Sequence, residues 1–136
     1  MKNDLWQREE NLMKNNNFRQ LIGVQIQHIS IGAAVLTLPF NEKLLQSGKM
    51  VHGGVFSVLI DAVIGTAVRT VLEDNTFGVT AEMNINYFRP VTEGAIQAKG
   101  KVVNKGRLLV VGIGDIVDEK GRLLATGRAT YAIKES

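Results

Sequence analysis

The feature that most constrains the fold is a run of small and apolar residues that extends from Gly53 to Leu72. On a helix, these residues cover one broad side and much of the other, and a helix that is apolar nearly all round is buried on most sides. The run therefore predicts a long helix enclosed by the rest of the chain. One carboxylate, Asp61, interrupts it, and because burial of an unpaired carboxylate is costly, this residue indicates a functional site.

Strand-like segments lie on both sides of the predicted helix. Before it, residues 24–29 and 33–40 predict a hairpin around Gly32. After it, four strands are predicted, in the segments 77–90, 94–104, 107–118 and 122–133. The turns between them are rich in proline, glycine, asparagine and aspartate, as antiparallel hairpins are. We therefore expect an α+β fold in which one long antiparallel sheet wraps around one buried central helix, with the last four strands as a meander.

The chain is expected to form a single domain over residues 1–136. Its N-terminal segment, residues 1–22, carries apolar positions among polar ones and predicts one or two short helices, interrupted around residues 15–17. Gly112 and Gly114 lack the third glycine and the following helix of a dinucleotide-binding loop. We expect these glycines to let a strand bend or approach a helix closely.

Composition excludes several kinds of site. The chain contains no cysteine, which rules out disulfides, a thiol nucleophile and thiolate metal ligands. The two histidines, His28 and His52, lie on separate predicted elements. We therefore expect no metal site and no cofactor.

The charge pattern bears on partners and location. The net charge is +3, and the basic residues are scattered rather than gathered in a block, so we expect no nucleic-acid partner. The first residues carry charges throughout, without the apolar core of a signal peptide, and no segment reaches the roughly 20 apolar residues of a membrane span. We therefore expect a cytoplasmic protein without a membrane partner.

The residues His52, Gly53 and Gly54 open the predicted helix. Without Cβ atoms, backbone N–H groups at a helix start can approach a ligand, and their positive partial charge suits a developing oxyanion. A tight turn that needs positive φ is the alternative explanation of the glycines.

Gly53 and Asp61 are eight residues apart, about 12 Å along one helix axis, so they cannot contact the same reacting atom from one helix. A two-fold dimer with antiparallel helices would bring each Gly53 near the Asp61 of the other copy.

The stretch VHGGVFSVLIDAVIGTA, followed by GVTAEMNINYFRPV, resembles the hotdog-fold acyl-CoA thioesterases. The resemblance is to the subfamily typified by the phenylacetic-acid-degradation thioesterase, and it runs from about residue 20 to the last residues of the chain. It implies a hotdog fold, hydrolysis of acyl-CoA without a cofactor, and a homodimer as the minimal unit, with homotetramers expected from the family.

The resemblance also implies roles for individual residues. The acidic residue of the family's central helix attacks the thioester or activates the water that does so, and Asp61 holds this position. The backbone N–H of Gly53 matches the donor to the thioester oxygen. Gln46 matches a residue near the thioester and the water, and Thr80 matches a hydroxyl residue that holds the water or the acid. His52 matches a supporting residue that orients the loop.

Further residues are candidates for contacts with the substrate. Arginine and lysine suit the phosphates of coenzyme A, and the basic residues beside predicted turns are Arg89, Lys105 and Arg107. Gly54 lies beside the expected thioester position, and the shape of the acyl pocket depends on the packing of apolar residues such as Phe56 and Met83. Aromatic and medium-chain aliphatic acyl groups both remain open.

Two other functions are alternatives at this point. One is an acyl-thioester hydratase or dehydratase, in which His52 would pair with Asp61. The other is a non-catalytic domain of the same fold that binds acyl-CoA for regulation. The whole pattern around HGG and MNINY favours the thioesterase, and the presence of Asp61 favours catalysis over binding alone.

Overall fold

The computed structural model describes residues 3–136; the two residues before them, which begin the predicted domain and the predicted segment 1–22, lie outside this description. The helices are α1 (Asp4–Met13), α2 (Asn17–Ile22), the short 3-10 helix η1 (Glu42–Leu44) and α3 (Gly53–Arg69). The strands are β1 (Gln25–Ser30), β2 (Ala33–Leu38), β3 (Thr76–Tyr87), β4 (Ile96–Lys105), β5 (Leu109–Val117) and β6 (Leu123–Glu135). Each predicted helix and strand is present, and α3 ends three residues before the predicted Leu72.

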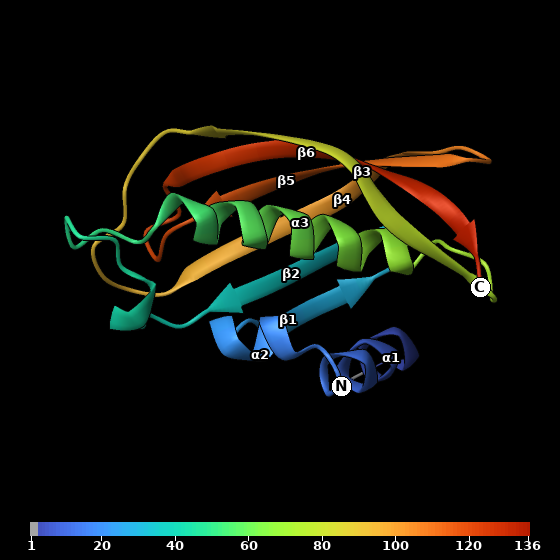
Figure 1. Cartoon of the computed structure of the whole chain (residues 1–136), viewed down its shortest axis with the longest axis horizontal. Coiled ribbons are helices and arrows are strands. Elements are labelled where there is room, and N and C mark those ends of the chain that lie inside the picture. The colour runs from blue at the N-terminus through green and yellow to red at the C-terminus, as the bar shows by residue number, and fades with distance from the viewer. Residues whose placement is uncertain (1–2) are drawn as a thin grey trace.

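The strands form one antiparallel sheet in the order β1-β2-β4-β5-β6-β3. The sheet curves around α3, which lies along its concave side (Figure 1). The helix residues Leu59, Ile60, Val63 and Ile64 are completely buried. This arrangement agrees with the expected α+β fold, in which burial of an apolar helix against a sheet forms the core.

The predicted four-stranded meander is wrong in one respect. Strands β4, β5 and β6 follow one another as neighbours, but β3 pairs with β6, and β4 pairs with β2. The segment after β3 therefore crosses the end of the sheet to reach β4 (Figure 1). Pro90 and Gly94 do not close a tight hairpin. The chain between them instead buries Val91 and pairs it with the segment before α3. The N–H of Val51 donates a hydrogen bond of 2.8 Å to the carbonyl oxygen of Val91.

A row of glycines brings the sheet close to α3. Gly100, Gly114 and Gly127 are paired with one another across β4, β5 and β6. A Cβ on Gly100 would lie 2.9 Å from the carbonyl oxygen of Val63, and one on Gly127 would lie 2.9 Å from the Cγ2 of Ile60. Only glycine allows this approach without a shift of the neighbouring atoms.

Strand β3 contains a bulge between Thr80 and Glu82. Side chains alternate between the two faces of a strand, and an extra residue reverses the alternation. Gly78 and Thr80 face α3 before the bulge, while Met83 and Ile85 pack against the core after it. The bulge thus lets both halves of β3 present side chains to the helix.

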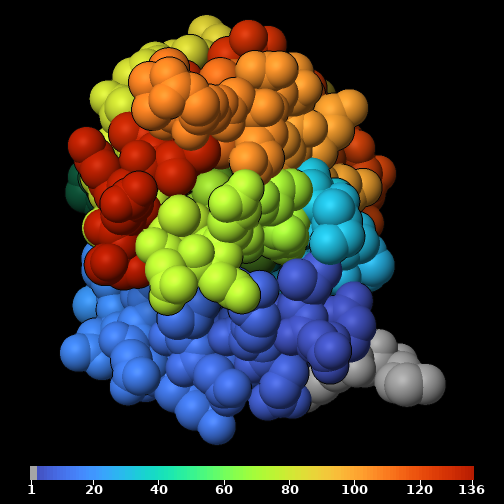
Figure 2. Space-filling model, turned by 90° about the vertical axis from the view of Figure 1, so that its right-hand side faces the viewer, coloured from blue at the N-terminus to red at the C-terminus, as the bar shows by residue number. Residues whose placement is uncertain are grey.

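The N-terminal helices form a separate layer. Asn3 and Asn16 cap α1 and α2 by accepting hydrogen bonds from the N–H groups of Trp6 and Arg19, as N-cap residues do. In Figure 2 this layer (blue) lies against the chain around the end of α3 (yellow-green). No helix in the described part of the chain combines the length and the apolarity that crossing a membrane would require.

Candidate active site

The start of α3 leaves one backbone donor without a partner. His52 is the N-cap, and its Nδ1 atom accepts a hydrogen bond of 2.8 Å from the N–H of Gly54. The N–H of Val55 donates to the carbonyl oxygen of His52 at 2.9 Å. Within residues 3–136 the N–H of Gly53 has no acceptor. Of the first three N–H groups of the helix, only that of Gly53 is thus available to a ligand.

Tyr87, which has no distinguishing pattern in the sequence, lies beside this helix start. Its hydroxyl shares a hydrogen bond of 2.8 Å with that of Ser57 and donates to the carbonyl oxygen of Gly53 at 3.3 Å. Its ring stacks on Phe56, with the ring centroids 6.1 Å apart. The aromatic end of β3 therefore forms a wall next to Gly53.

Asp61 lies two turns further along α3 and is half-buried. Its Oδ1 atom accepts a hydrogen bond of 2.8 Å from the Thr80 hydroxyl. The Tyr131 hydroxyl lies 2.6 Å from the same oxygen and 2.7 Å from the carbonyl oxygen of Asp61, so it donates to this residue at both points. The Oδ2 atom accepts no hydrogen bond from the described residues. The carboxylate is thus fixed through one oxygen and open at the other.

Tyr131 holds Asp61 as a protonated donor. Burial raises the pKa of the Tyr131 hydroxyl, and the hydrogen bond to the Asp61 carboxylate and its negative charge raise that pKa further. A buried tyrosine hydroxyl requires a hydrogen-bond partner, and this one is Asp61. Thr80 and Tyr131 face each other in the pairing of β3 with β6. Because this register exists only in the folded sheet, the sequence carried no signal for the contact.

A cavity of about 260 Å³ opens beside the Asp61 carboxylate. Its walls come from α3 with Asp61, Gly65 and Arg69, from Thr80 and Tyr131 on the sheet, and from Asn16, Phe18 and Arg19 around α2. The N-terminal layer therefore contributes one wall of the candidate site.

Several predicted site residues lie elsewhere in the chain. Gln46 lies in the loop before α3, where its Oε1 atom accepts a hydrogen bond from the N–H of Gly48. Phe56 is 3% exposed and belongs to the core, and the half-buried Met83 packs against that core. None of these three contacts Asp61 through a hydrogen bond.

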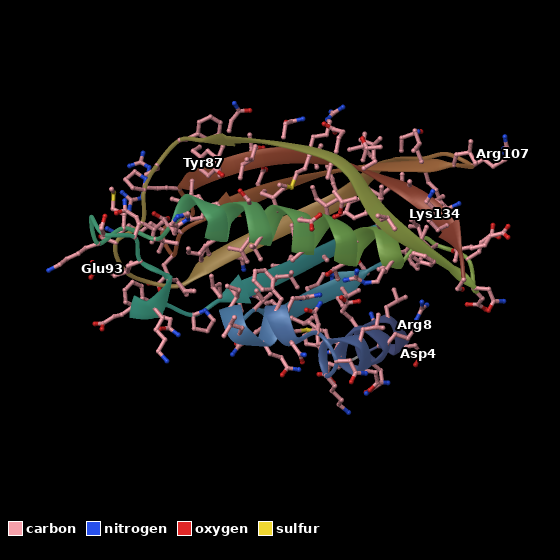
Figure 3. All side chains as sticks on the ribbon, in the orientation of Figure 1. Asp4, Arg8, Tyr87, Glu93, Arg107 and Lys134 are labelled. Carbon is pink, nitrogen blue, oxygen red and sulfur yellow. The ribbon has the colours of Figure 1, made fainter. Side chains whose placement is uncertain are left out.

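The basic candidates do not gather at one place in the chain. Arg89 follows Tyr87 by two residues, at the end of the molecule where α3 begins, whereas Arg107 lies at the tip of the β4–β5 turn at the opposite end (Figure 3). Lys105 ends β4 next to this turn. Residues 3–136 contain no group of three or more histidine, aspartate or glutamate side chains that could hold a metal ion.

A six-stranded antiparallel sheet that curves around one long helix is the fold of the hotdog thioesterases. Residues 48–125 match the model of the thioesterase superfamily. The chain belongs to this superfamily and is a thioester hydrolase. The predicted fold and the predicted family are both confirmed.

Two relatives and one solved structure illustrate the match. A candidate esterase from Saccharolobus solfataricus is 34% identical, over 90% of this chain and 81% of the relative. The 1,4-dihydroxy-2-naphthoyl-CoA hydrolase of Listeria monocytogenes is 32% identical, over 86% of this chain and 95% of the relative. The crystal structure of the thioesterase HI1161 from Haemophilus influenzae superposes with a TM-score of 0.88 at 25% identity, and covers 99% of this chain and 93% of that one.

Proposed function

We propose that the protein hydrolyses acyl-CoA thioesters to the free acid and CoA, with Asp61 as the reactive group. The observation that carries this proposal is the asymmetry of the carboxylate: Thr80 and Tyr131 both bind Oδ1, whereas Oδ2 accepts no hydrogen bond from the described residues, and Asp61 lines the cavity. A carboxylate that is held in place by its other oxygen has the geometry that a nucleophile or a general base requires.

The carboxylate fits two routes. As a general base, Oδ2 takes a proton from a water molecule whose oxygen attacks the thioester carbonyl carbon. As a nucleophile, Oδ2 attacks that carbon itself and forms an anhydride, which water then hydrolyses. In both routes the C–S bond breaks, CoA leaves as a thiolate that acquires a proton, and negative charge develops on the thioester oxygen. A backbone N–H placed at that oxygen can supply about 3–4 kcal/mol of stabilisation.

We assign this donor to the Gly53 N–H of a second copy of the chain. Gly53 and Asp61 are eight residues apart on one helix, about 12 Å along its axis, so the two groups of one protomer cannot act on one carbonyl. If two α3 helices lie antiparallel about a two-fold axis, Gly53 of each copy lies near Asp61 of the other, and two identical sites form. The free edge of the sheet supports such a dimer, since β3 ends the strand order and exposes Phe77, Val79 and Tyr87.

The same dimer explains the separation of the basic candidates. Antiparallel helices place the Arg107 end of one copy beside the Arg89 end of the other. Basic residues from both copies then meet near one site, where arginine suits the phosphates of CoA. His52 acts in this scheme by holding the Gly54 N–H, which leaves Gly53 as the donor.

The test is release of thiol from a panel of aryl and alkyl acyl-CoA substrates, with wild type beside Asp61→Asn and Asp61→Ala. Loss of a general base or nucleophile is expected to lower kcat by about 100-fold or more, while circular dichroism and the oligomeric state stay unchanged. Asp61→Asn keeps an acceptor for Thr80 and Tyr131, so it is the matched control for structure. Turnover of the panel by both variants at the wild-type rate would disprove the role of Asp61.

A further inference from the structure

A buried cluster of charged side chains joins the N-terminal layer to α3. Glu9 of α1 and Arg19 of α2 are 4% and 5% exposed, and Thr66 of α3 is fully buried. Glu9 accepts a hydrogen bond of 2.8 Å from the Nη1 of Arg19 and one of 3.0 Å from the Nε of Arg69, whose Nη2 also donates to Glu9. One carboxylate thus faces two guanidinium groups, and the cluster keeps one net positive charge.

The two arginines keep donors that this cluster does not use. The Nε and Nη2 atoms of Arg19 are buried and have no hydrogen-bond partner within the described residues. The Nη1 atom of Arg69 likewise makes no hydrogen bond within residues 3–136. Buried polar groups in native proteins are nearly always paired, and leaving a charged donor unpaired is costly. The buried Arg19 atoms have almost no accessible surface, so a ligand cannot reach them. The side chain of Arg69 is 38% exposed, and its Nη1 atom can bind an acceptor from outside the chain.

These arginines belong to the cavity that contains Asp61. Arg19 and Arg69 both line it. The Nη1 of Arg69 lies 3.6 Å from the point that a Cβ on Gly65 would occupy, and the Tyr131 hydroxyl lies 3.2 Å from the same point. The guanidinium of Arg69 thus reaches across Gly65 toward the hydroxyl that holds Asp61.

The size of the cavity indicates which part of a substrate enters it. At about 260 Å³ it is smaller than the pockets of about 300–1,000 Å³ that enclose a drug-sized ligand, so it has no room for coenzyme A. It accommodates an acyl group whose thioester carbon lies at Asp61 and whose far end points to the arginines.

We propose that Arg69, together with the positive charge of the neighbouring Arg19, binds a carboxylate at the far end of the acyl group, so that the substrates are CoA thioesters of dicarboxylic acids. This inference rests on the proposed function. The Nη1 of Arg69 offers charge-assisted hydrogen bonds to that carboxylate, and the net positive charge of the cluster offsets the repulsion between the substrate carboxylate and Asp61. An acyl group with a methyl end leaves the same donors unpaired, and a site built to bind a polar group discriminates against the analogue that lacks it.

The experiment compares acyl-CoA pairs that differ only at the far end: glutaryl with pentanoyl, adipoyl with hexanoyl, and suberyl with octanoyl. For the pair of best length we expect the dicarboxylic substrate to have a kcat/KM about 10- to 100-fold higher, the range for hydrogen bonds to a charged group. Arg69→Gln is expected to bring the ratio close to one. Arg8→Gln removes the same charge from the exposed face of α1, outside this cavity, and is expected to keep the preference.

A binding measurement separates recognition from catalysis. In Asp61→Ala, adipoyl-CoA is expected to bind more tightly than hexanoyl-CoA by the same factor, and the double variant with Arg69→Gln is expected to lose the difference. Equal or better turnover of the alkyl member of every pair by the wild type would overturn this inference and leave the proposed function standing. Hydrolysis of no acyl-CoA by the wild type would overturn the proposed function, and this inference with it.

Discussion

The ring of Tyr87 lies over Gly53, with its Cε1 atom 3.5 Å from the point that a Cβ on Gly53 would occupy. That separation is ordinary van der Waals contact, so a methyl group fits at position 53. Gly53 is therefore not explained by a lack of space for a side chain, and its proposed role rests on its N–H group, which has no acceptor among the described residues.

Gly53→Pro tests this donor directly. Proline removes the N–H, is tolerated at the first position of a helix, and suits the residue before it, since His52 has φ −59° and ψ 135°. We expect kcat to fall by about 10²–10³-fold, the effect of losing one oxyanion donor, with the far-ultraviolet circular dichroism unchanged. Gly53→Ala keeps the N–H and is expected to stay active. Full activity of Gly53→Pro would show that the donor is another group.

Mixed dimers test whether two copies share each site. One copy carries Gly53→Pro and the other Asp61→Ala, and the two are co-expressed with different tags and purified over both. If each site combines Asp61 of one copy with Gly53 of the other, one of the two sites regains both groups, and the mixed dimer is expected to have about half the wild-type activity. Sites contained within single protomers predict no recovery.

Tyr131→Phe removes the donor to Oδ1 and to the carbonyl oxygen of Asp61 while it keeps the buried ring. We expect kcat to fall by about 10- to 100-fold, since the hydroxyl donates to a charged group, with little change in KM because the ring keeps the cavity wall. Thr80→Val removes the other donor to Oδ1, and its smaller or equal effect on kcat is the comparison. A change confined to KM would contradict a role in positioning Asp61.

Acid is expected to weaken the junction between α1, α2 and α3. Burial raises the pKa of Glu9, but the hydrogen bonds and charges of Arg69 and Arg19 outweigh it and hold this pKa below its ordinary value of 4.5. A group whose pKa is lowered by folding stabilises the fold above its unfolded-state pKa, and the stabilisation is lost as pH falls through the folded-state pKa. The free energy of unfolding is therefore expected to fall as pH drops below about 4.5.

Glu9→Gln isolates this contribution. At neutral pH the variant leaves two guanidinium groups without their carboxylate, and removal of one partner of a buried ion pair costs about 3–5 kcal/mol. Urea unfolding across a range of pH is expected to show a large difference between wild type and Glu9→Gln at neutral pH, which narrows in acid. A difference that is independent of pH would mean that Glu9 is not ionised in the folded protein.

The fold was largely predictable because its signals are local. Apolar residues that recur around a helix marked residues 53–72, alternation marked the strands, and Asn and Gly residues marked the turns. The partner of β3 was not predictable in this way. Turn residues such as Pro90 and Gly94 suggest a change of direction, but they do not show whether the chain reverses within a hairpin or crosses the end of the sheet.

In the candidate site, too, local features were predictable and long-range contacts were not. Asp61 was identified because a carboxylate within an apolar helix requires an explanation, and that reasoning needs only neighbouring residues. Tyr131 and the Glu9–Arg19–Arg69 cluster were missed, because their contacts join residues that are far apart in the sequence, 70 positions in the case of Tyr131 and Asp61. In the sequence, a tyrosine in a strand and a glutamate in a helix give no indication of these long-range contacts.

The close contact between the sheet and α3 predicts a graded response to alanine. At Gly127 a Cβ would lie 2.7 Å from the carbonyl oxygen of Asn84 and 2.9 Å from Ile60, whereas at Gly114 the nearest atom is a Val63 methyl group at 3.3 Å. We expect Gly127→Ala to lower the free energy of unfolding by about 1–3 kcal/mol, as overpacking does, and Gly114→Ala to lower it less. Denaturant unfolding measures both, and the reverse order would contradict the geometry.

The bulge in β3 makes the length of this strand matter more than the identity of its exposed residues. Ala81 lies at the bulge and is exposed, so many substitutions there leave the contacts of Asp61 and Tyr131 intact. Loss of one codon at the same place would restore a regular alternation, and either Thr80 or the pair Met83 and Ile85 would then turn away from α3. Among descendants of this gene, point mutations are therefore expected to accumulate at position 81, while single-residue deletions there are eliminated by selection.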